Sequence, residues 1–495
     1  MTVASIDPGR EGRRWGALAL IVAAQFMVIL DVAIVNVALP SIKTDLHFSQ
    51  ANLQWVITAY AILFGGALLL GGRLADLLGR RRLFVAGLAV FVGSSLLSGL
   101  AWSEGSLIAF RALQGLGGAL LAPAALSILM TTFPEGRERN TALGIWGAAS
   151  GSGGAAGVLL GGLLTSYLSW SWIFFINIPV GAVVIALTPW LLRESRVETA
   201  ERRFDFAGAA SVTSGLMLLV YAMTRATQQG WGSNSTIVLL TGSVLLILTF
   251  ILIELRSQAP LLPLRMFRLR TLAAANAAGV VVAAVGFSMF FLLTLYLQQV
   301  LRYSAIQTGV AFITITLSIV VFSNVAQTLV TRLGPRRVLT TGLLLAAAAL
   351  ALFARLPVHG HYFWNVFPAL LLGGIGMALS FVPMTIAGLT GVERADAGVA
   401  SGLINTSRQI GGAVGLAAVS TIATTYTGHY VGSHAGTTPL SGSALTHGFD
   451  VTFSVLTALA IVGALVAAIF IEPQRRVTEV EPQREEIIRP VEEAA

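Results

Sequence analysis

The stretch Gly72-Arg73-Leu74-Ala75-Asp76-Leu77-Leu78-Gly79-Arg80-Arg81-Arg82 joins two apolar runs, 53–72 and 82–101. Each run has about the 20 residues that an α-helix needs to cross the hydrocarbon core of a bilayer. The residues between them are rich in arginine, and arginine in short loops accumulates on the cytoplasmic side of a membrane. The stretch therefore predicts a cytoplasmic loop between two transmembrane helices.

The composition of the whole chain also indicates a membrane protein. Of its 495 residues, 55% are hydrophobic and only 11% are charged, and the mean hydropathy is +0.81, whereas soluble domains carry about 25% charged residues. So few polar residues cannot cover a surface that faces water. Because a backbone inside a bilayer must satisfy its own hydrogen bonds, we predict an all-α polytopic membrane protein.

Fourteen stretches are long and apolar enough to be transmembrane helices. We place them at 15–39, 53–72, 82–101, 106–131, 140–164, 171–192, 206–225, 235–255, 272–300, 304–330, 336–354, 363–389, 397–424 and 449–471. They form two blocks of six spans, 15–192 and 272–471, around a linker, 193–271, that holds two more. The ends are predicted to be a cytoplasmic N-terminus, 1–14, and a disordered cytoplasmic tail, 472–495.

The basic residues predict the direction of insertion. Of the 31 Lys and Arg residues, 25 lie in loops or ends on the side of the N-terminus, four on the opposite side, and two, Arg111 and Arg408, inside spans. This bias predicts that both termini are cytoplasmic. The arginines are spread over many short loops without a patch of aromatic residues, so nucleic-acid binding is not expected. The chain has no Cys, which excludes disulfides and Cys-based metal sites.

A weak internal repeat relates the two blocks of six spans. Thr331-Arg332-Leu333-Gly334-Pro335-Arg336-Arg337 follows the second span of the later block, as Asp76-Leu77-Leu78-Gly79-Arg80-Arg81-Arg82 follows the second span of the earlier one. Thr331 stands where the first copy has Asp76. Repeated halves of this kind place a substrate path between them, near the middle of the bilayer.

Two charged side chains inside the first block are candidates for coupling. Asp31 is the only carboxylate that we predict near the middle of a span, and Arg111 is a buried cation in the fourth span. A charge at that depth costs a few kcal/mol and usually faces a cavity or a partner. Burial favours the protonated carboxyl group and a nearby cation favours the ionised one, so a moving partner would switch Asp31 between the two. The alternatives are a fixed structural ion pair, or Arg111 bound to backbone carbonyls.

Four motifs occur in order along the first block: Leu30-Asp31-Val32-Ala33-Ile34-Val35-Asn36-Val37-Ala38-Leu39-Pro40, the loop at 72–82, Arg111-Ala112-Leu113-Gln114-Gly115-Leu116-Gly117-Gly118, and the glycine-rich segment 147–162. Together they resemble the major facilitator superfamily, and within it the fourteen-span drug:proton antiporter branch. The resemblance implies a major facilitator fold, with two six-helix bundles plus two extra central helices. It also implies that Asp31 and Arg111 take part in proton coupling.

The resemblance makes the loop at 72–82 a cytoplasmic gate, with Gly72, Asp76, Gly79 and Arg80 as its residues. Gly72 lets a neighbouring helix approach closely. Asp76 can pair with an arginine such as Arg80 or lie at the N-terminus of a facing helix. The alternative is that these charges only set the topology.

A glycine repeat in the fifth span predicts close helix packing. Gly153, Gly157 and Gly161 recur every fourth residue and so share one flat helix face. This segment resembles the antiporter motif with one departure, because Val158 follows Gly157 where the family usually has proline. The departure leaves the expected kink, and with it the antiporter assignment, open.

Polar and aromatic side chains inside the spans are candidates for a substrate cavity. They are Gln25, Asn36, Trp55, Tyr60, Gln114, Tyr296 and Arg408. Helix packing or anchoring at the membrane interface is the alternative for each of them. For Arg408, packing against the opposite half is the interpretation that we favour.

The resemblance predicts a proton-coupled efflux antiporter of lipophilic small molecules such as drugs or antibiotics. It would work by alternating access, as a monomer, in a bacterial inner membrane, with the lipid bilayer, protons and the small-molecule substrate as its partners. No nucleotide-binding loop occurs, so we expect no enzyme, no cofactor and no metal, and energy from a proton gradient. The alternatives are a proton-coupled uptake symporter of a small metabolite, and a membrane receptor or scaffold that does not transport.

Overall fold

The computed structural model describes residues 8–48, 50–53, 55–134, 136–195, 205–257, 260–393, 396–434, 438–439 and 441–473. Within these residues the secondary structure is helical and no strand occurs. The predictions for the first seven residues, for 196–204 in the linker and for the tail from 474 onward lie outside the described residues.

The first half of the chain forms eight helices. They are α1 (Pro8–Asp45), α2 (Gln50–Leu53), α3 (Trp55–Leu78), α4 (Arg80–Gly99), α5 (Glu104–Thr132), α6 (Arg137–Tyr167), α7 (Trp172–Phe175) and α8 (Asn177–Leu191). Two further helices follow, α9 (Phe206–Gln229) and α10 (Asn234–Arg256), and then a 3₁₀ turn, η1 (Leu264–Arg268).

The second half has the same general plan. It contains α11 (Arg270–Leu295), the π turn η2 (Tyr296–Val300), α12 (Ala305–Ala311), α13 (Ile313–Leu333), α14 (Pro335–Phe353), the π turn η3 (Tyr362–Val366), α15 (Phe367–Leu389), α16 (Ala397–Ser433) and α17 (Gly442–Phe470). Several helices start at a side-chain cap; Ser103 before α5 and Ser304 before α12 each form a capping box, which satisfies backbone donors that the first turn leaves free.

The predicted membrane-spanning architecture is confirmed. Thirteen helical segments in the described residues are long and apolar enough to cross a membrane, and α6 makes the fourteenth when its two parts count as one span. The parts of α6, on either side of residue 155, meet at an angle of 40°. The bend occurs without a proline and next to Gly153-Gly154, and glycine pairs are a known site of helix kinks.

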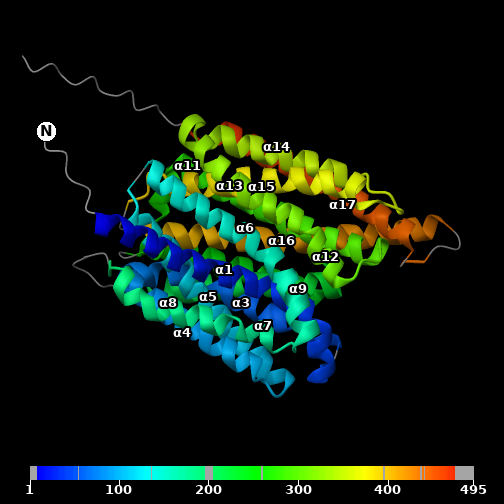
Figure 1. Ribbon diagram of the computed structural model, residues 1–495, viewed down its shortest axis with the longest axis horizontal. Helices are drawn as coiled ribbons and strands as arrows, with labels where there is room; N and C mark the ends of the chain where they lie inside the picture. Colours follow the sequence, from blue (N-terminus) through cyan, green and yellow to red (C-terminus); the bar gives the residue numbers. More distant parts are fainter. Residues whose placement is uncertain are drawn as a thin grey trace, which may run out of the picture.

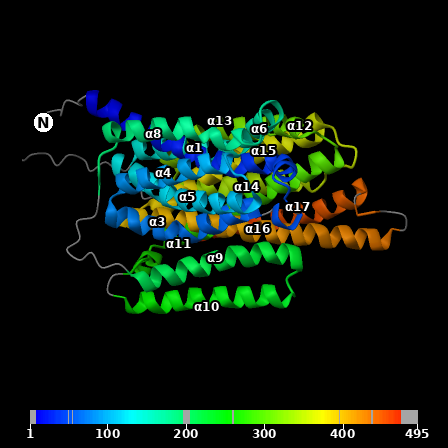
Figure 2. The same cartoon turned by 90° about the horizontal axis from the view of Figure 1, so that it is seen from below.

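The long helices run along one axis and form an elongated bundle (Figure 1). α9 and α10 lie on one side of it, with α10 outermost (Figure 2). α9 packs against α3 and α16, which belong to different halves. α3 also packs against α16, and α6 against α13; these are among the helix pairs that join the halves directly.

One predicted loop is wrong. The sequence placed the last two spans at 397–424 and 449–471 with an outer loop between them, but α16 continues to Ser433 and α17 begins at Gly442. Both helices therefore extend beyond the apolar runs from which the spans were predicted. A helix satisfies its own backbone hydrogen bonds in water as well as in lipid, so the end of an apolar run does not mark the end of the helix.

Candidate functional site

Asp31 and Arg111 form a buried ion pair in the first half. Nη1 of Arg111 on α5 donates to Oδ2 of Asp31 on α1 at 2.6 Å, and the two side chains are 1% and 0% exposed. The structure thus brings together the two residues that the sequence singled out. Arg111 also donates from Nε to the carbonyl oxygen of Val56 at 3.1 Å, so the backbone contact considered as an alternative exists beside the ion pair.

Two amide side chains complete the shell around Asp31. Gln114 on α5 donates to Oδ1 of Asp31 at 2.8 Å, and Asn177 at the start of α8 donates to the same oxygen at 3.0 Å. Gln114 in turn accepts from Nη1 of Arg111 at 2.6 Å, and Asn177 also donates to Ser95 on α4 at 3.0 Å. A buried ion pair is favourable only when such hydrogen bonds satisfy its remaining groups.

Aromatic rings enclose the arginine. The guanidinium carbon of Arg111 lies 4.4 Å from the ring centre of Tyr60 on α3 and 5.7 Å from that of Phe174 on α7. These contacts add a cation–π attraction to the ion pair. Through Asp31 and its neighbours, α1, α3, α4, α5, α7 and α8 meet at one point, so a change in the charge of Asp31 affects most of this bundle.

Helix α6, the fifth span of this half, packs against the Asp31 segment from the other side. A Cβ atom at Gly157 would lie 2.8 Å from the carbonyl oxygen of Leu30, and one at Gly161 would lie 2.9 Å from that of Ile34. At Gly153 it would lie 2.9 Å from a side-chain carbon of Ile29. The glycine face of α6 therefore packs against the segment of α1 that carries Asp31, and larger side chains would push the two helices apart.

A second cluster, which we call the Asp76 latch, joins the two halves. Oδ1 of Asp76 at the end of α3 accepts from the backbone N–H of Gly398, and Oδ2 accepts from that of Val399, both at 3.2 Å. Arg80 donates to Oδ1 from Nη2 at 2.7 Å and from Nε at 3.2 Å. Gly398 and Val399 are in the first turn of α16, where free N–H groups and the helix dipole favour an anion. Both roles considered for Asp76 thus occur at once.

Two positions of the predicted gate require glycine, each for a different structural reason. At Gly72 a Cβ atom would overlap the carbonyl oxygen of Gly398, so only glycine lets α3 approach α16 this closely. Gly79 has φ of 110°, a conformation that other residues rarely adopt. It precedes α4, whose first N–H groups at Arg81 and Arg82 donate to Glu194 at 3.1 and 3.2 Å.

The repeated segment in the second half makes the corresponding contact. Thr331 in the last turn of α13 accepts a hydrogen bond at 3.1 Å from Nδ2 of Asn140 in the first turn of α6. Oγ1 of Thr331 donates to the carbonyl oxygen of Gln327 at 3.0 Å. Asp76 and Thr331 therefore both contact the beginning of a helix in the opposite half, but the first contact is charged and the second is neutral.

The residues proposed for a substrate cavity are distributed over several places. Tyr60 and Gln114 belong to the Asp31 cluster, and Gln114 is fully buried. Tyr296, also fully buried, donates to the carbonyl oxygen of Pro357 at 2.7 Å. In this conformation neither Gln114 nor Tyr296 faces an open space.

The other four candidates each have a different neighbour. Gln25 donates to Ser150 of α6 at 3.3 Å, and Asn36 bonds to its own helix. The ring of Trp55 lies 5.5 Å from that of Tyr221 on α9. The guanidinium of Arg408 lies 4.9 Å from the ring centre of Phe381, and its Nε has no hydrogen-bond partner among the described residues. A role of these side chains in substrate binding stays a prediction.

Sequence reasoning missed three contributors to these clusters. Asn177 and Ser95 are ordinary polar residues whose contact with Asp31 or with each other depends on the tertiary structure. Glu194 follows α8 in the charged linker, and only the fold shows that it caps α4. The Trp-Ser-Trp-Ile-Phe-Phe-Ile-Asn sequence at 170–177 was the one signal that could have pointed to Asn177.

Comparison with known proteins agrees with this architecture. The sequence profile described as Major Facilitator Superfamily matches residues 21–416, most of the chain. The chain belongs to the Major Facilitator Superfamily. A solved structure of the human organic anion transporter TETRAN superposes with a TM-score of 0.61 over 92% of this chain and 98% of that one. Its sequence identity of 16% means that the likeness concerns the fold alone.

Several relatives in this superfamily are closer in sequence. The puromycin resistance protein of Streptomyces alboniger is 40% identical over 94% of this chain and 92% of its own length. The cephamycin export protein of Amycolatopsis lactamdurans is 41% identical over 82% of this chain and 84% of its own. The tetracenomycin C resistance and export protein of Streptomyces glaucescens is 36% identical over 84% and 77%.

Proposed function

We propose that this protein is an efflux transporter that expels antibiotics or similar lipophilic small molecules in exchange for protons. Its relatives are named for resistance to, or export of, puromycin, cephamycin and tetracenomycin C. These names describe different antibiotics, which favours export of varied antibiotics as the shared activity over one fixed substrate. Membership of a transporter superfamily supports transport over catalysis.

The buried pair of Asp31 and Arg111 is the observation that supports proton coupling. In the described conformation Asp31 lies beside the guanidinium of Arg111 and accepts hydrogen bonds from Arg111, Gln114 and Asn177. If α5 moves relative to α1, the carboxylate loses Arg111 and Gln114, two of these partners, in a buried site. An isolated buried charge is costly, so Asp31 would then take up a proton. Movement of the helices and protonation of Asp31 would thus be linked.

The two contacts between the halves support alternating access. The Asp76 latch and the bond between Asn140 and Thr331 both lie at the end of the bundle that carries the Arg-rich loops. We assign that end, and both termini, to the cytoplasm of a bacterial cell because basic residues accumulate there. With both contacts formed, the cytoplasmic side is closed, and export requires that they break and re-form in each cycle.

The direct test uses everted membrane vesicles that contain the protein and have been energised to form an acidic interior, with a pH-sensitive dye inside. Puromycin, cephamycin and tetracenomycin C are added separately. An antiporter would release protons as it moves a substrate inward, so the dye signal would recover for at least one compound. Vesicles without the protein are the control. Proton movement in the same direction as the compound would instead identify a symporter.

A further inference from the structure

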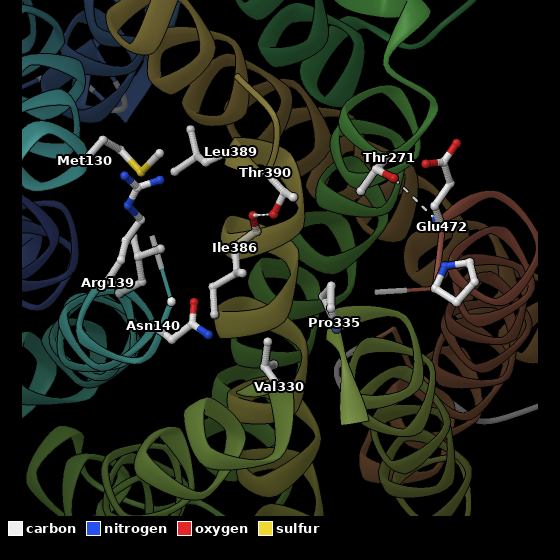
Figure 3. A pocket seen from close by; sticks show the side chains of 13 residues that line it. Met130, Arg139, Asn140, Thr271, Val330, Pro335, Ile386, Leu389, Thr390 and Glu472 are labelled. Atoms are coloured by element: carbon white, nitrogen blue, oxygen red, sulfur yellow. Dashed lines mark hydrogen bonds between the residues drawn. The ribbon is translucent and has the colours of Figure 1, made fainter. Parts of the chain in front are cut away.

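A cavity of about 600 Å³ lies at the cytoplasmic end of the bundle, outside the ion-pair cluster (Figure 3). Its near wall comes from α5 and α6 in the first half, with Met130, Arg139 and Asn140. Its far wall comes from α15 in the second half, with Ile386 and Leu389. The cavity therefore lies where the two halves meet, and it borders neither Asp31 nor Asp76.

The lining of the cavity combines apolar and polar side chains, which suits a lipophilic guest that carries polar groups. Small-molecule sites are typically 300–1,000 Å³, mostly apolar, with a few polar groups that orient the ligand. Here Met130, Ile386 and Leu389 are apolar and at most 8% exposed, so they form its deep part. Polar and charged side chains also line the cavity: Arg139, Asn140, Thr271, Thr390 and Glu472. Thr390 is exposed, so the cavity is open towards the surface at this point.

One of the two contacts between the halves borders this cavity. Asn140, which lines it, donates to Thr331, and Val330 beside Thr331 lines it too. This contact is one neutral hydrogen bond, whereas in the Asp76 latch two N–H groups of α16 donate to the carboxylate of Asp76. Hydrogen bonds with a charged partner are roughly twice as strong as neutral ones. The halves should therefore separate more easily on the α6–α13 side than on the α3–α16 side.

We propose that this cavity is a loading site, where a lipophilic substrate binds from the cytoplasm before the halves separate, and that the hydrogen bond between Asn140 and Thr331 is its gate. The proposal rests on the proposed export function and adds the place of first binding. Substrate in the cavity would contact α5 and α6 on one side and α15 on the other. Its binding would thus act on the weaker of the two contacts between the halves.

The first experiment measures binding by protection of a single thiol. Because the native chain has no Cys, Thr390→Cys supplies the only target for N-ethylmaleimide in everted vesicles, with puromycin as the probe. Arg137→Cys is the matched control, since it is exposed at the start of α6 and does not line the cavity. At ten times its dissociation constant a ligand fills about 90% of its sites, so the labelling rate at Thr390→Cys should fall about tenfold. The rate at Arg137→Cys should not change.

The second experiment needs no ligand and tests the gate. In an Ile386→Cys background, Thr331→Val removes the hydroxyl but keeps the volume, and should raise the labelling rate about twofold to tenfold, as expected for one lost neutral hydrogen bond. Thr331→Asp introduces the residue that the first repeat has at this position, so that a carboxylate faces the start of α6. This variant should lower the labelling rate. Unchanged rates in both variants would overturn the gate.

The two experiments separate the loading site from the export function. If vesicles extrude puromycin but puromycin leaves Thr390→Cys unprotected, the loading site is overturned and export stands. If puromycin protects Thr390→Cys but is not moved, the site stands and export of puromycin is overturned. If puromycin neither protects Thr390→Cys nor is moved, the result counts against both the loading site and export of puromycin.

Discussion

Replacing Asp76 by Asn should weaken the cytoplasmic closure of the protein. Arg80 lies on the same half as Asp76, so within the Asp76 latch only the bonds from Gly398 and Val399 connect the two halves. An amide offers one oxygen instead of two, so one N–H loses its acceptor and the other keeps only a neutral one. With about 1.5–3 kcal/mol for a charge-assisted bond and about 0.5–1.5 kcal/mol for a neutral one, the closed state should lose at least about 1.5 kcal/mol. That is at least about a tenfold change in the ratio of closed to open protein.

Spin labels report this ratio directly. Leu78→Cys at the end of α3 and Glu393→Cys before α16 are exposed positions on opposite halves, and no native Cys competes for the label. The distance distribution by pulsed electron resonance should shift from mainly short to mainly long in Asp76→Asn. Glu138→Gln removes an exposed cytoplasmic carboxylate and should leave the distribution unchanged. The reasoning would be refuted if Asp76→Asn kept the native distribution, or if Thr331→Ala shifted it as much.

Three further predictions follow from topology and packing. Ser433→Cys should react with an impermeant thiol reagent in intact cells and Arg137→Cys only after permeabilisation; the reverse pattern would contradict the assigned orientation. Gly157→Leu should separate α6 from α1 and reduce both folded yield and efflux, as measured by size-exclusion profile and drug resistance, whereas Val158→Leu should reduce neither. Arg111→Lys keeps the charge but not the planar fork, so its transport rate should fall between wild type and Arg111→Ala; equal rates for the two variants would show that the charge is unimportant.

The fold was largely predictable because one physical signal dominates this chain. Apolar runs of about 20 residues and the uneven distribution of arginine give the number and direction of spans without knowledge of any contact. The same signal does not predict where helices end, as with α16 and α17. Hydropathy indicates which residues lie in the bilayer, whereas backbone hydrogen bonding determines where a helix ends. The bend in α6 is a similar case, because glycines provide it in the absence of the expected proline.

The candidate site was predictable only where a residue is unusual for its surroundings. Asp31, Arg111 and Asp76 stand out because charge in an apolar segment needs a partner. Asn177 and Asn140 do not stand out, since an amide in a membrane helix is common and its partner comes from a distant helix. The substrate-cavity candidates show the same limit: polarity alone did not separate Gln114, which bonds to Asp31, from residues that would contact a substrate.

The central claim is that Asp31 carries the coupled proton. Asp31→Asn mimics the protonated carboxyl group and leaves Arg111 without its counter-charge, at a cost to stability of about 3–5 kcal/mol. The double variant Asp31→Asn/Arg111→Gln should recover much of that stability, which separates loss of coupling from loss of folding.

The most direct measurement is proton release on addition of a transported compound to purified protein in lipid vesicles. Wild type should release protons in proportion to the compound moved. Asp31→Asn, alone and with Arg111→Gln, should release none while still binding the compound. Exchange of compound for protons by Asp31→Asn at the wild-type ratio would contradict the account.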